Sequence, residues 1–470
     1  MAKVRMAASA AFRARRLVPV AALVLAACTP MYTLPPVALP EAVRPGEQVV
    51  VAKDWWKAFG DPVLEKLIDD AFAASPTWEQ AVARVEAAEA RLGISRARLL
   101  PGVDAKVAGV RQQLSEITNP ASGGSGFSVF QGNLSAFWEL DLFGRVRNEV
   151  AASRSDLLSA EYGRDSVRLT LASRVAQTYF QIRALDAQLE TARLTVRSRE
   201  NAYRLREKRF LGGVTSELDL RQAESELTSA RAQVPDLVAA ISQAEGALAE
   251  LTGASPKDLF AAGSPRGKTI DAIPLPPAVP EGLPSDLLNR RPDIREAEEG
   301  LRATQARVAG ARAAWFPVIG LTGAYGGESL QFGDLFKGPA RAWSYAGSVS
   351  VPVFNAGQTA AQVDAASAAE KAAAANYRAV VIRAFADARN AIIAKREAEY
   401  RASAREQTVA ALRRQAKLAS LRYDNGYSNY LEVLDAERAL FSAELALAEA
   451  RRAHLSAAVD LYRALGGGWK

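Results

Sequence analysis

The 470-residue sequence predicts a mostly helical protein with four β-strands, which would form part of a transmembrane β-barrel. Three observations predict this fold class. Two regions alternate between apolar and polar residues as strands do, two proline-free regions could form unusually long helices, and a long stretch of sequence occurs twice. Because one chain supplies only four strands, the barrel would have to be shared between chains.

The N-terminal 27 residues predict a secretory signal peptide. They contain five Arg and Lys residues and no acid, and they end in the apolar stretch Leu17–Ala27. Since this segment carries five of the chain's seven surplus positive charges, the remainder gives little reason to expect nucleic-acid binding. No other apolar run reaches the roughly 18 residues that a membrane-spanning helix needs, so we expect strands to make any further crossing.

Cys28 is the only cysteine and ends the sequence Leu25-Ala26-Ala27-Cys28. A lone thiol in an exported protein has no disulfide partner. The four residues resemble the bacterial lipobox, which implies an N-acyl group and an S-diacylglycerol on Cys28. The residue that follows is Thr29, whereas an aspartate would resemble the inner-membrane retention signal, so outer-membrane delivery is implied. We expect residues 28–60 to form a lipidated tether. An ordinary signal peptide with a chance cysteine is the alternative.

After the tether, a helical pattern runs from Asp61 to Leu99 with a break at Ser75-Pro76, where proline is tolerated in a first helical turn. Alternating stretches at 133–142 and 343–353 then predict strands, each with an expected partner before it. We therefore expect β-hairpins at about 102–143 and 315–354.

The expected strands are about ten residues long, which suits a tilted crossing of a bilayer. Aromatic residues near strand ends are typical of the interfacial girdles of membrane barrels. Places in an ordinary protein core are the alternative. The candidate girdle residues are Trp138, Tyr325, Trp343 and Tyr345.

Each hairpin is followed by a region without proline, Arg145–Phe210 or Gln358–Asp424. At about 1.5 Å per residue each would form a helix of roughly 100 Å, a length that favours coiled-coil-like packing. The glycines that follow, Gly213 and Gly426, suit left-handed C-caps. Return helices then begin at new N-caps. We expect long helical hairpins at 145–252 and 357–465.

The segments that join the helices of each hairpin are copies of each other. Arg209–Asp219 is matched by Arg422–Glu432, a shift of 213 residues. In both, an N-cap residue is followed three positions later by an acid, as in a capping box. We therefore expect two structural repeats, at 61–273 and 285–470, joined by a proline-rich linker at 274–284.

Four strands with an outward apolar face cannot span a bilayer alone, because their edges would leave backbone groups unpaired in hydrocarbon. Closure needs about eight strands or more, so at least two chains must share one barrel. We expect the long helices, which continue from the strands, to form a hollow cylinder below it. This arrangement favours a symmetric wall over a catalytic pocket.

Two further stretches carry a family resemblance. Leu287–Glu298, with Arg290-Arg291-Pro292-Asp293-Ile294-Arg295 at its centre, resembles a signature of outer membrane efflux proteins. These are the TolC- and OprM-like outer membrane factors, and the chain is similar to their lipidated NodT-type branch. Tyr430–Arg438 resembles that family's motif after the second helical tip. The resemblance covers nearly the whole mature chain.

The resemblance implies a homotrimer with a twelve-stranded barrel and a periplasmic tunnel, anchored by lipid in the outer membrane. It also implies two partners, a periplasmic adaptor protein and an inner-membrane efflux pump of the RND type. The implied function is a passive exit duct for drugs or other small toxic molecules. A type I protein-secretion conduit of the same fold and a lipid-anchored coiled-coil scaffold without a pore remain alternatives.

By the same resemblance, Leu431, Asp435 and Arg438 match the apolar and acidic rings that close the periplasmic end of the tunnel. A solvated acid in an interhelical ion pair is the alternative for Asp435. The position equivalent to Asp435 in the first repeat is Gln222, so no second acidic ring is expected there.

The two tips would contact the adaptor, with simple helix turns as the alternative. The tip residues are Gly212, Gly213, Val214, Thr215 and Ser216 in the first repeat and Gly426, Tyr427, Ser428 and Asn429 in the second.

Little in the sequence suggests catalysis, and no catalytic residue, metal site or cofactor other than the lipid is expected. The segment Ala262–Thr269 loosely fits a phosphate-binding loop, but the prolines that follow cannot form the helix that such a loop must open. Arg291-Pro292-Asp293 is interpreted as a helix start, with Pro and Asp favoured in the first turn. The single histidine, His454, lies among helical residues.

Overall fold

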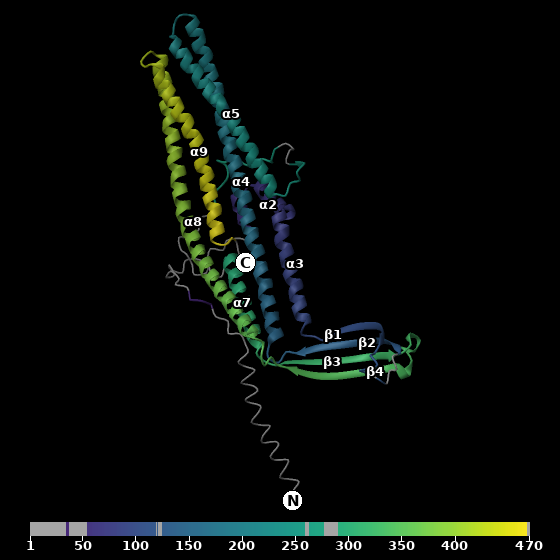
Figure 1. Cartoon of the computed structure of the whole chain (residues 1–470). Helices are drawn as coiled ribbons and strands as arrows, with labels where there is room; N and C mark the ends of the chain where they lie inside the picture. Colours follow the sequence, from purple (N-terminus) through teal and green to yellow (C-terminus); the bar gives the residue numbers. More distant parts are fainter. Residues whose placement is uncertain are drawn as a thin grey trace. The chain divides into compact units, whose positions relative to one another are not determined.

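The computed structural model describes residues 34–36, 54–118, 120, 125–258, 263–276 and 290–467. The chain is mostly helical and contains one four-stranded antiparallel sheet (Figure 1). It forms two compact units, each built from both sequence repeats. The strand-bearing unit holds the described residues of 84–161 and 296–378, and the helical unit holds those of 54–83, 162–295 and 379–467. The signal peptide and Cys28 lie outside the described residues.

The sheet pairs its strands in chain order (Figure 1). Its strands are β1 (Gly102–Gln113), β2 (Gly126–Leu140), β3 (Val318–Ser329) and β4 (Arg341–Ser350). All three pairings are antiparallel, and β2 pairs with β3 to join the two hairpins. The expectation of four strands is confirmed. The outer edges of β1 and β4 have no partner within this sheet.

The strand register gives the sheet one continuous apolar face. Leu134 lies opposite Tyr325, which lies opposite Trp343, and residues directly opposite in an antiparallel pair share a face. Ile319 lies opposite both Leu140 and Val349 on this same face. Since most of these side chains are exposed in a single chain, the sheet carries an apolar surface without a partner.

The predicted long helices are present. α4 (Arg145–Leu211) and α8 (Gln358–Asp424) each have 67 residues, and α5 (Glu217–Leu251) and α9 (Tyr430–Ala464) return beside them (Figure 1). The Asp141 carboxylate accepts hydrogen bonds from the backbone N–H groups of Val146 (3.1 Å) and Arg147 (2.7 Å), which satisfies two of the N–H groups in the first turn of α4. Among the described residues, no helix is both long enough and apolar enough to cross a membrane.

The shorter helices begin at prolines, which the sequence predicts for Pro76 and Pro292. They are α2 (Pro62–Ala74), α3 (Pro76–Ala97) and α7 (Pro292–Ala313), and short 3-10 turns lie at Trp55–Phe59, Phe332–Asp334 and Gly338–Ala340. A proline in the first turn costs no hydrogen bond, because that N–H has no intrahelical acceptor.

The end of the expected tether differs from the prediction. Residues 54–60 do not extend freely, because Trp55, Trp56 and Phe59 are buried in the core of the helical unit. Trp55 stacks on Tyr462, with ring centroids 5.5 Å apart. Three large aromatic side chains within five residues gain several kcal/mol by burial, about 1.5–3 kcal/mol each. This gain explains why the segment folds onto the helices.

Candidate functional site

The two helical tips have the same backbone geometry. Gly213 and Gly426 have φ angles of +68° and +76°, so the predicted left-handed C-caps are confirmed. In the first tip the N–H of Val214 donates to the carbonyl of Arg209 (2.8 Å). In the second, the N–H of Tyr427 donates to the carbonyl of Arg422, also at 2.8 Å. These bonds satisfy carbonyls at the helix ends, as in a Schellman motif.

The return helices begin at the predicted N-caps. The Ser216 hydroxyl accepts a hydrogen bond from the N–H of Asp219, and the side-chain amide oxygen of Asn429 accepts one from the N–H of Glu432, both at 3.2 Å. Glu432 does not complete a reciprocal capping box. Instead it forms an ion pair with Arg422 (3.1 Å) across the tip.

The tips present apolar side chains to solvent. Val214 and Tyr427 occupy equivalent positions and are 75% and 77% exposed. Thr215 and Ser428, the next residues in each tip, are half-buried, and their hydroxyl oxygens are covered but have no hydrogen-bond partner within the described chain. The other tip residues are exposed. Each tip thus combines one exposed apolar side chain with one covered hydroxyl that lacks a hydrogen-bond partner among the described residues.

The expected gate residues lie on one side of α9. Leu431 is 47% exposed and the Asp435 side chain is 65% exposed, one turn further along. The Arg438 guanidinium lies 3.8 Å from the Asp435 carboxylate, and the two groups form a weak ion pair. Its stronger partner is Glu226 on α5, to which its Nε donates at 2.6 Å. Arg438 therefore connects the second helical hairpin to the first.

Glu226 is part of a buried ion cluster that the sequence did not reveal. Its carboxylate lies 3.0 Å from Arg199 of α4, and both side chains are less than one-tenth exposed. Nearby, burial raises the pKa of Glu437. The Arg206 guanidinium lies 4.2 Å from the ring centroid of Tyr430, whose pKa burial raises to about 12. The repeat gave no signal for this cluster, because the position that corresponds to Glu226 in the second repeat is an alanine.

Arg291 has the structural role that the sequence predicts. Its guanidinium donates to the carbonyl of Ala464 (3.0 Å) and to the carboxylates of Asp293 (2.6 Å) and Asp387 (3.3 Å). The side chain thus joins the start of α7 to α8 and to the end of α9. These acceptors are a backbone carbonyl and two carboxylates of helix residues, so the contacts of Arg291 are structural.

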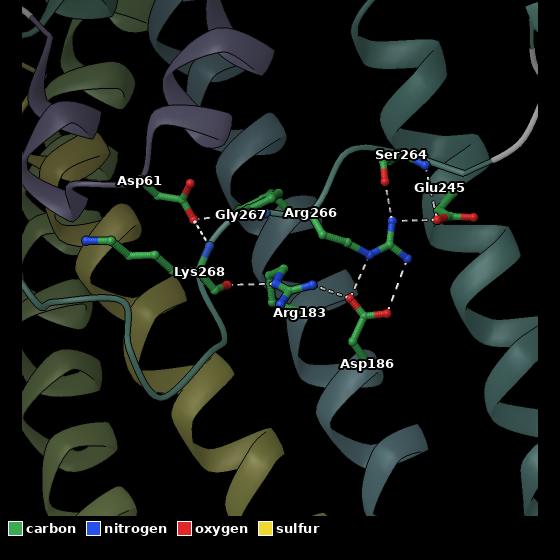
Figure 2. A network of polar contacts seen from close by, with 9 residues as sticks. Asp61, Arg183, Asp186, Glu245, Ser264, Arg266, Gly267 and Lys268 are labelled. Atoms are coloured by element: carbon green, nitrogen blue, oxygen red, sulfur yellow. Dashed lines mark hydrogen bonds and ion pairs between the residues drawn. The ribbon is translucent and has the colours of Figure 1, made fainter. Parts of the chain in front are cut away.

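The segment that loosely resembled a phosphate-binding loop instead holds helices together (Figure 2). The Arg266 guanidinium contacts Asp186 of α4 (2.7 Å) and Glu245 of α5 (2.6 Å). The backbone N–H of Lys268 donates to the buried carboxylate of Asp61 (3.0 Å), and Arg183 donates to the Lys268 carbonyl (2.8 Å). These polar groups are therefore satisfied by the protein itself.

The four candidate girdle residues share the apolar face of the sheet. Trp343 and Tyr345 stack with centroids 5.7 Å apart, and Tyr325 lies opposite Trp343 near the loop ends of the strands. Trp138 lies at the helix end of β2, where its indole N–H donates to the carbonyl of Leu99 (3.0 Å). The sheet thus places aromatic residues at both ends of one apolar surface.

Within the described ranges, no group of three or more His, Cys, Asp or Glu side chains is placed to hold a metal ion. His454 is buried on α9, and its Nε2 has no hydrogen-bond partner in the described part of the chain. Burial lowers its pKa, and Glu399 of α8 acts in the opposite direction. The histidine is thus part of helix packing.

Comparison with known proteins matches this architecture to one family. The outer membrane efflux protein family matches residues 67–254 and 283–467. The chain is 36% identical over 428 residues to the solvent efflux pump outer membrane protein SrpC of Pseudomonas putida, with 90% of each protein covered. It is 34% identical over 423 residues to the pyoverdine export outer membrane protein OpmQ of Pseudomonas aeruginosa, covering 89% of this chain and 88% of OpmQ.

The fold also matches a solved channel. The Campylobacter jejuni CmeC outer membrane channel superposes with a TM-score of 0.88 at 26% identity, covering 94% of this chain and 95% of CmeC. The four antiparallel strands and the long helices thus have a counterpart in a channel rather than in an enzyme. The chain belongs to the outer membrane efflux protein family and is a non-enzymatic outer membrane channel of an efflux pump.

Proposed function

We propose that three copies of the chain form the exit duct of a tripartite efflux system. The sheet is the main support for this proposal, because it has an apolar face and two unpaired edges, β1 and β4. In hydrocarbon those edges must be paired, so β4 of one copy would pair with β1 of the next. Three sets of four strands give a twelve-stranded barrel, which lies within the range of membrane barrels.

The long helices would continue from this barrel as a periplasmic tunnel that ends at the tips. We assign the tip residues to contact with the helical hairpin of a periplasmic adaptor, which connects the duct to an inner-membrane pump of the RND type. Exposed Val214 and Tyr427, and the unsatisfied hydroxyls of Thr215 and Ser428, support this assignment.

The exported molecules would be drugs or other small toxic compounds. SrpC is named for solvent efflux and OpmQ for pyoverdine export, and both align with about nine-tenths of this chain. These relatives support small-molecule export over protein secretion by a type I system.

Cys28 would anchor each copy through an N-acyl group and an S-diacylglycerol, as in the lipidated NodT-type branch. The lipobox-like sequence before it supports this proposal. Mass spectrometry of the N-terminal peptide tests it: the acyl mass should appear on Cys28 and disappear in Cys28→Ala. An unmodified thiol in the mature protein would contradict it.

Leu431, Asp435 and Arg438 would form the closed end of the tunnel. Three symmetry-related Asp435 carboxylates in a narrow passage would repel one another and attract cations. The exposure of Asp435 and its weak contact with Arg438 leave the carboxylate available for this role.

Conductance in planar bilayers tests both the duct and the gate. The purified wild-type protein should form channels of low conductance, and Asp435→Ala should raise the conductance and weaken the preference for cations. Gln222→Ala is the matched control, because it removes the equivalent polar side chain of the first repeat. Equal effects of the two variants would contradict the gate, and absence of wild-type channels would contradict the duct.

A further inference from the structure

The strand-bearing unit contains a charged groove whose lining includes none of the tip, gate or girdle candidates. It is lined by α3, α4 and α7 and has a volume of about 690 Å³. Arg84, Arg91 and Arg98 lie along it at intervals of seven residues, on α3 and just beyond its end. Because seven residues make nearly two helical turns, the three side chains form one stripe along this helix. We call these three residues the arginine stripe.

The arginine stripe is exposed, and carboxylates compensate only part of the positive charge in the groove. None of its three guanidinium groups forms an ion pair with another described residue, whereas Arg307 of α7 is paired with Asp156 of α4. Glu149 is the remaining carboxylate in the lining. Four arginines against two carboxylates leave a surplus of two positive charges in the groove of each chain.

The contacts of α4 show which side of the helices the groove occupies. Ser153 of α4 meets Ser95 of α3 (2.7 Å), and Ser159 of α4 donates to the carbonyl of Glu296 of α7 (3.1 Å). At about 100° per residue, these contacts are about 120° apart by the shorter path around α4. Glu149 and Asp156 project within this shorter arc.

The groove therefore lies on the side of α4 that is enclosed between α3 and α7. This is the concave side of the three helices. When a wall of helices closes into a tunnel, its concave side faces the interior. Arg96 of α3 and Arg154 of α4 project elsewhere: neither lines the groove, and both are exposed.

We infer that the arginine stripe lines the interior of the duct and makes this part of it favour anionic solutes. The inference rests on the proposed function, because an interior exists only when copies assemble. Three copies would place a surplus of six positive charges around one passage. Charged rings set the ion preference of pores, and guanidinium groups bind carboxylates, sulfonates and phosphates through paired N–H groups. The matching substrate class is small organic anions.

Reversal potentials across planar bilayers in a potassium chloride gradient test the inference. In Arg91→Gln/Arg98→Gln, the chloride-to-potassium permeability ratio should fall about two-fold or more relative to wild type. The control Arg96→Gln/Arg154→Gln removes the same number of charges from the same two-helix region outside the groove, and it should leave the ratio unchanged. Arg91→Lys/Arg98→Lys keeps the charge and should retain most of the wild-type ratio.

A second readout is export by cells that lack the native protein and express each variant. Arg91→Gln/Arg98→Gln should slow the export of a dye bearing a carboxylate but not of a neutral solvent. Equal permeability ratios in the stripe and control variants would overturn the inference while leaving the proposed duct intact. Absence of any wild-type channel would overturn both, because the stripe would then have no interior to line.

Discussion

At the scale of single residues, Asp61 shows how one carboxylate can hold distant segments together. It accepts hydrogen bonds from the N–H of Val63 at the start of α2 (3.0 Å), from the Tyr179 hydroxyl (2.6 Å) and from the N–H of Lys268 (3.0 Å). The carboxylate is fully buried, and three donors offset the cost of that burial. Burial, and then the bond to Asp61, raise the pKa of Tyr179.

Gly267 is required by this contact. A Cβ at Gly267 would overlap both the Asp61 carboxylate and the Tyr179 hydroxyl, which hold each other in place. We expect Gly267→Ala to lower the free energy of unfolding by about 1–3 kcal/mol. Gly93→Ala, where a Cβ meets nothing within 4 Å on an exposed helix, should instead add about 0.5–1 kcal/mol. Thermal denaturation of both variants checks the pair, and similar shifts would contradict it.

His454 predicts a stability that depends on pH. Burial lowers its pKa, so the unfolded chain takes up the proton first as pH falls. This contribution to stability is present above about pH 6.5 and is lost at lower pH. Glu399 and Glu406 weaken the effect and Lys395 adds to it. His454→Gln, which does not titrate, should lose less thermal stability than wild type between about pH 7.5 and 5.5. Parallel losses in both proteins would contradict this role.

At the scale of elements, the two long helical hairpins have the same backbone motif at their tips. A glycine with positive φ closes the first helix, and a side-chain oxygen caps the next, in both copies. The two tips differ in side chains, with Val214 and Thr215 in one and Tyr427 and Ser428 in the other. The backbone is thus repeated while the presented surface varies.

Replacing the tip glycines should separate docking from folding. A Cβ at Gly213 or Gly426 meets nothing within 4 Å, but a non-glycine residue there costs about 1–2 kcal/mol because φ is positive. We expect valine or glutamate at both positions to abolish export and adaptor cross-linking while trimer levels remain normal. Asparagine tolerates this conformation and should retain more export. Full drug resistance in the valine variants would exclude the tips from docking.

At the scale of the whole molecule, the sheet of a single chain has two edge strands without a partner on one side. β1 and β4 are edges, and the apolar face that continues across the sheet is uncovered. Three strand-to-strand steps of about 4.8 Å place β1 roughly 14 Å from β4 within one flat chain. That separation far exceeds the reach of a disulfide, about 7 Å between Cα atoms.

Disulfide cross-linking between β1 and β4 therefore reports only contacts between copies. With Ala108→Cys and Ser344→Cys in one chain, oxidation in the membrane should give covalent dimers and trimers on a denaturing gel. Each single variant is a control that should remain monomeric, because Cys28 is the only other cysteine and its sulfur, bonded to the proposed diacylglycerol, cannot form a disulfide. If cysteine pairs shifted by two or four residues along β4 also gave only monomer, closure of the barrel by neighbouring copies would be wrong.

Much of the fold could be predicted from local sequence. Prolines mark the starts of α2, α3 and α7, the glycines at 213 and 426 mark helix ends, and alternation marks strands. These signals work because they act within a few residues. The end of the expected tether could not be predicted in this way, because only the packing of Trp55 against Tyr462 shows that Trp55 belongs to the core.

The candidate site was only partly predictable. The tips and gate candidates could be proposed because the repeat and the family resemblance point to them, but the partner of Arg438 could not. Glu226 is separated from Arg438 by 212 residues, and no short-range pattern distinguishes it from the many acids on helix surfaces.

By itself, the sequence determined the kinds of elements, their order and the duplication, because periodicity and backbone hydrogen bonding are local requirements. Only the tertiary structure decided which side chains meet: Arg438 with Glu226, Lys268 with Asp61, and the stripe on α3 with the groove beside α4. Those contacts depend on how helices rotate and pack against one another, which long-range burial determines and no single segment encodes.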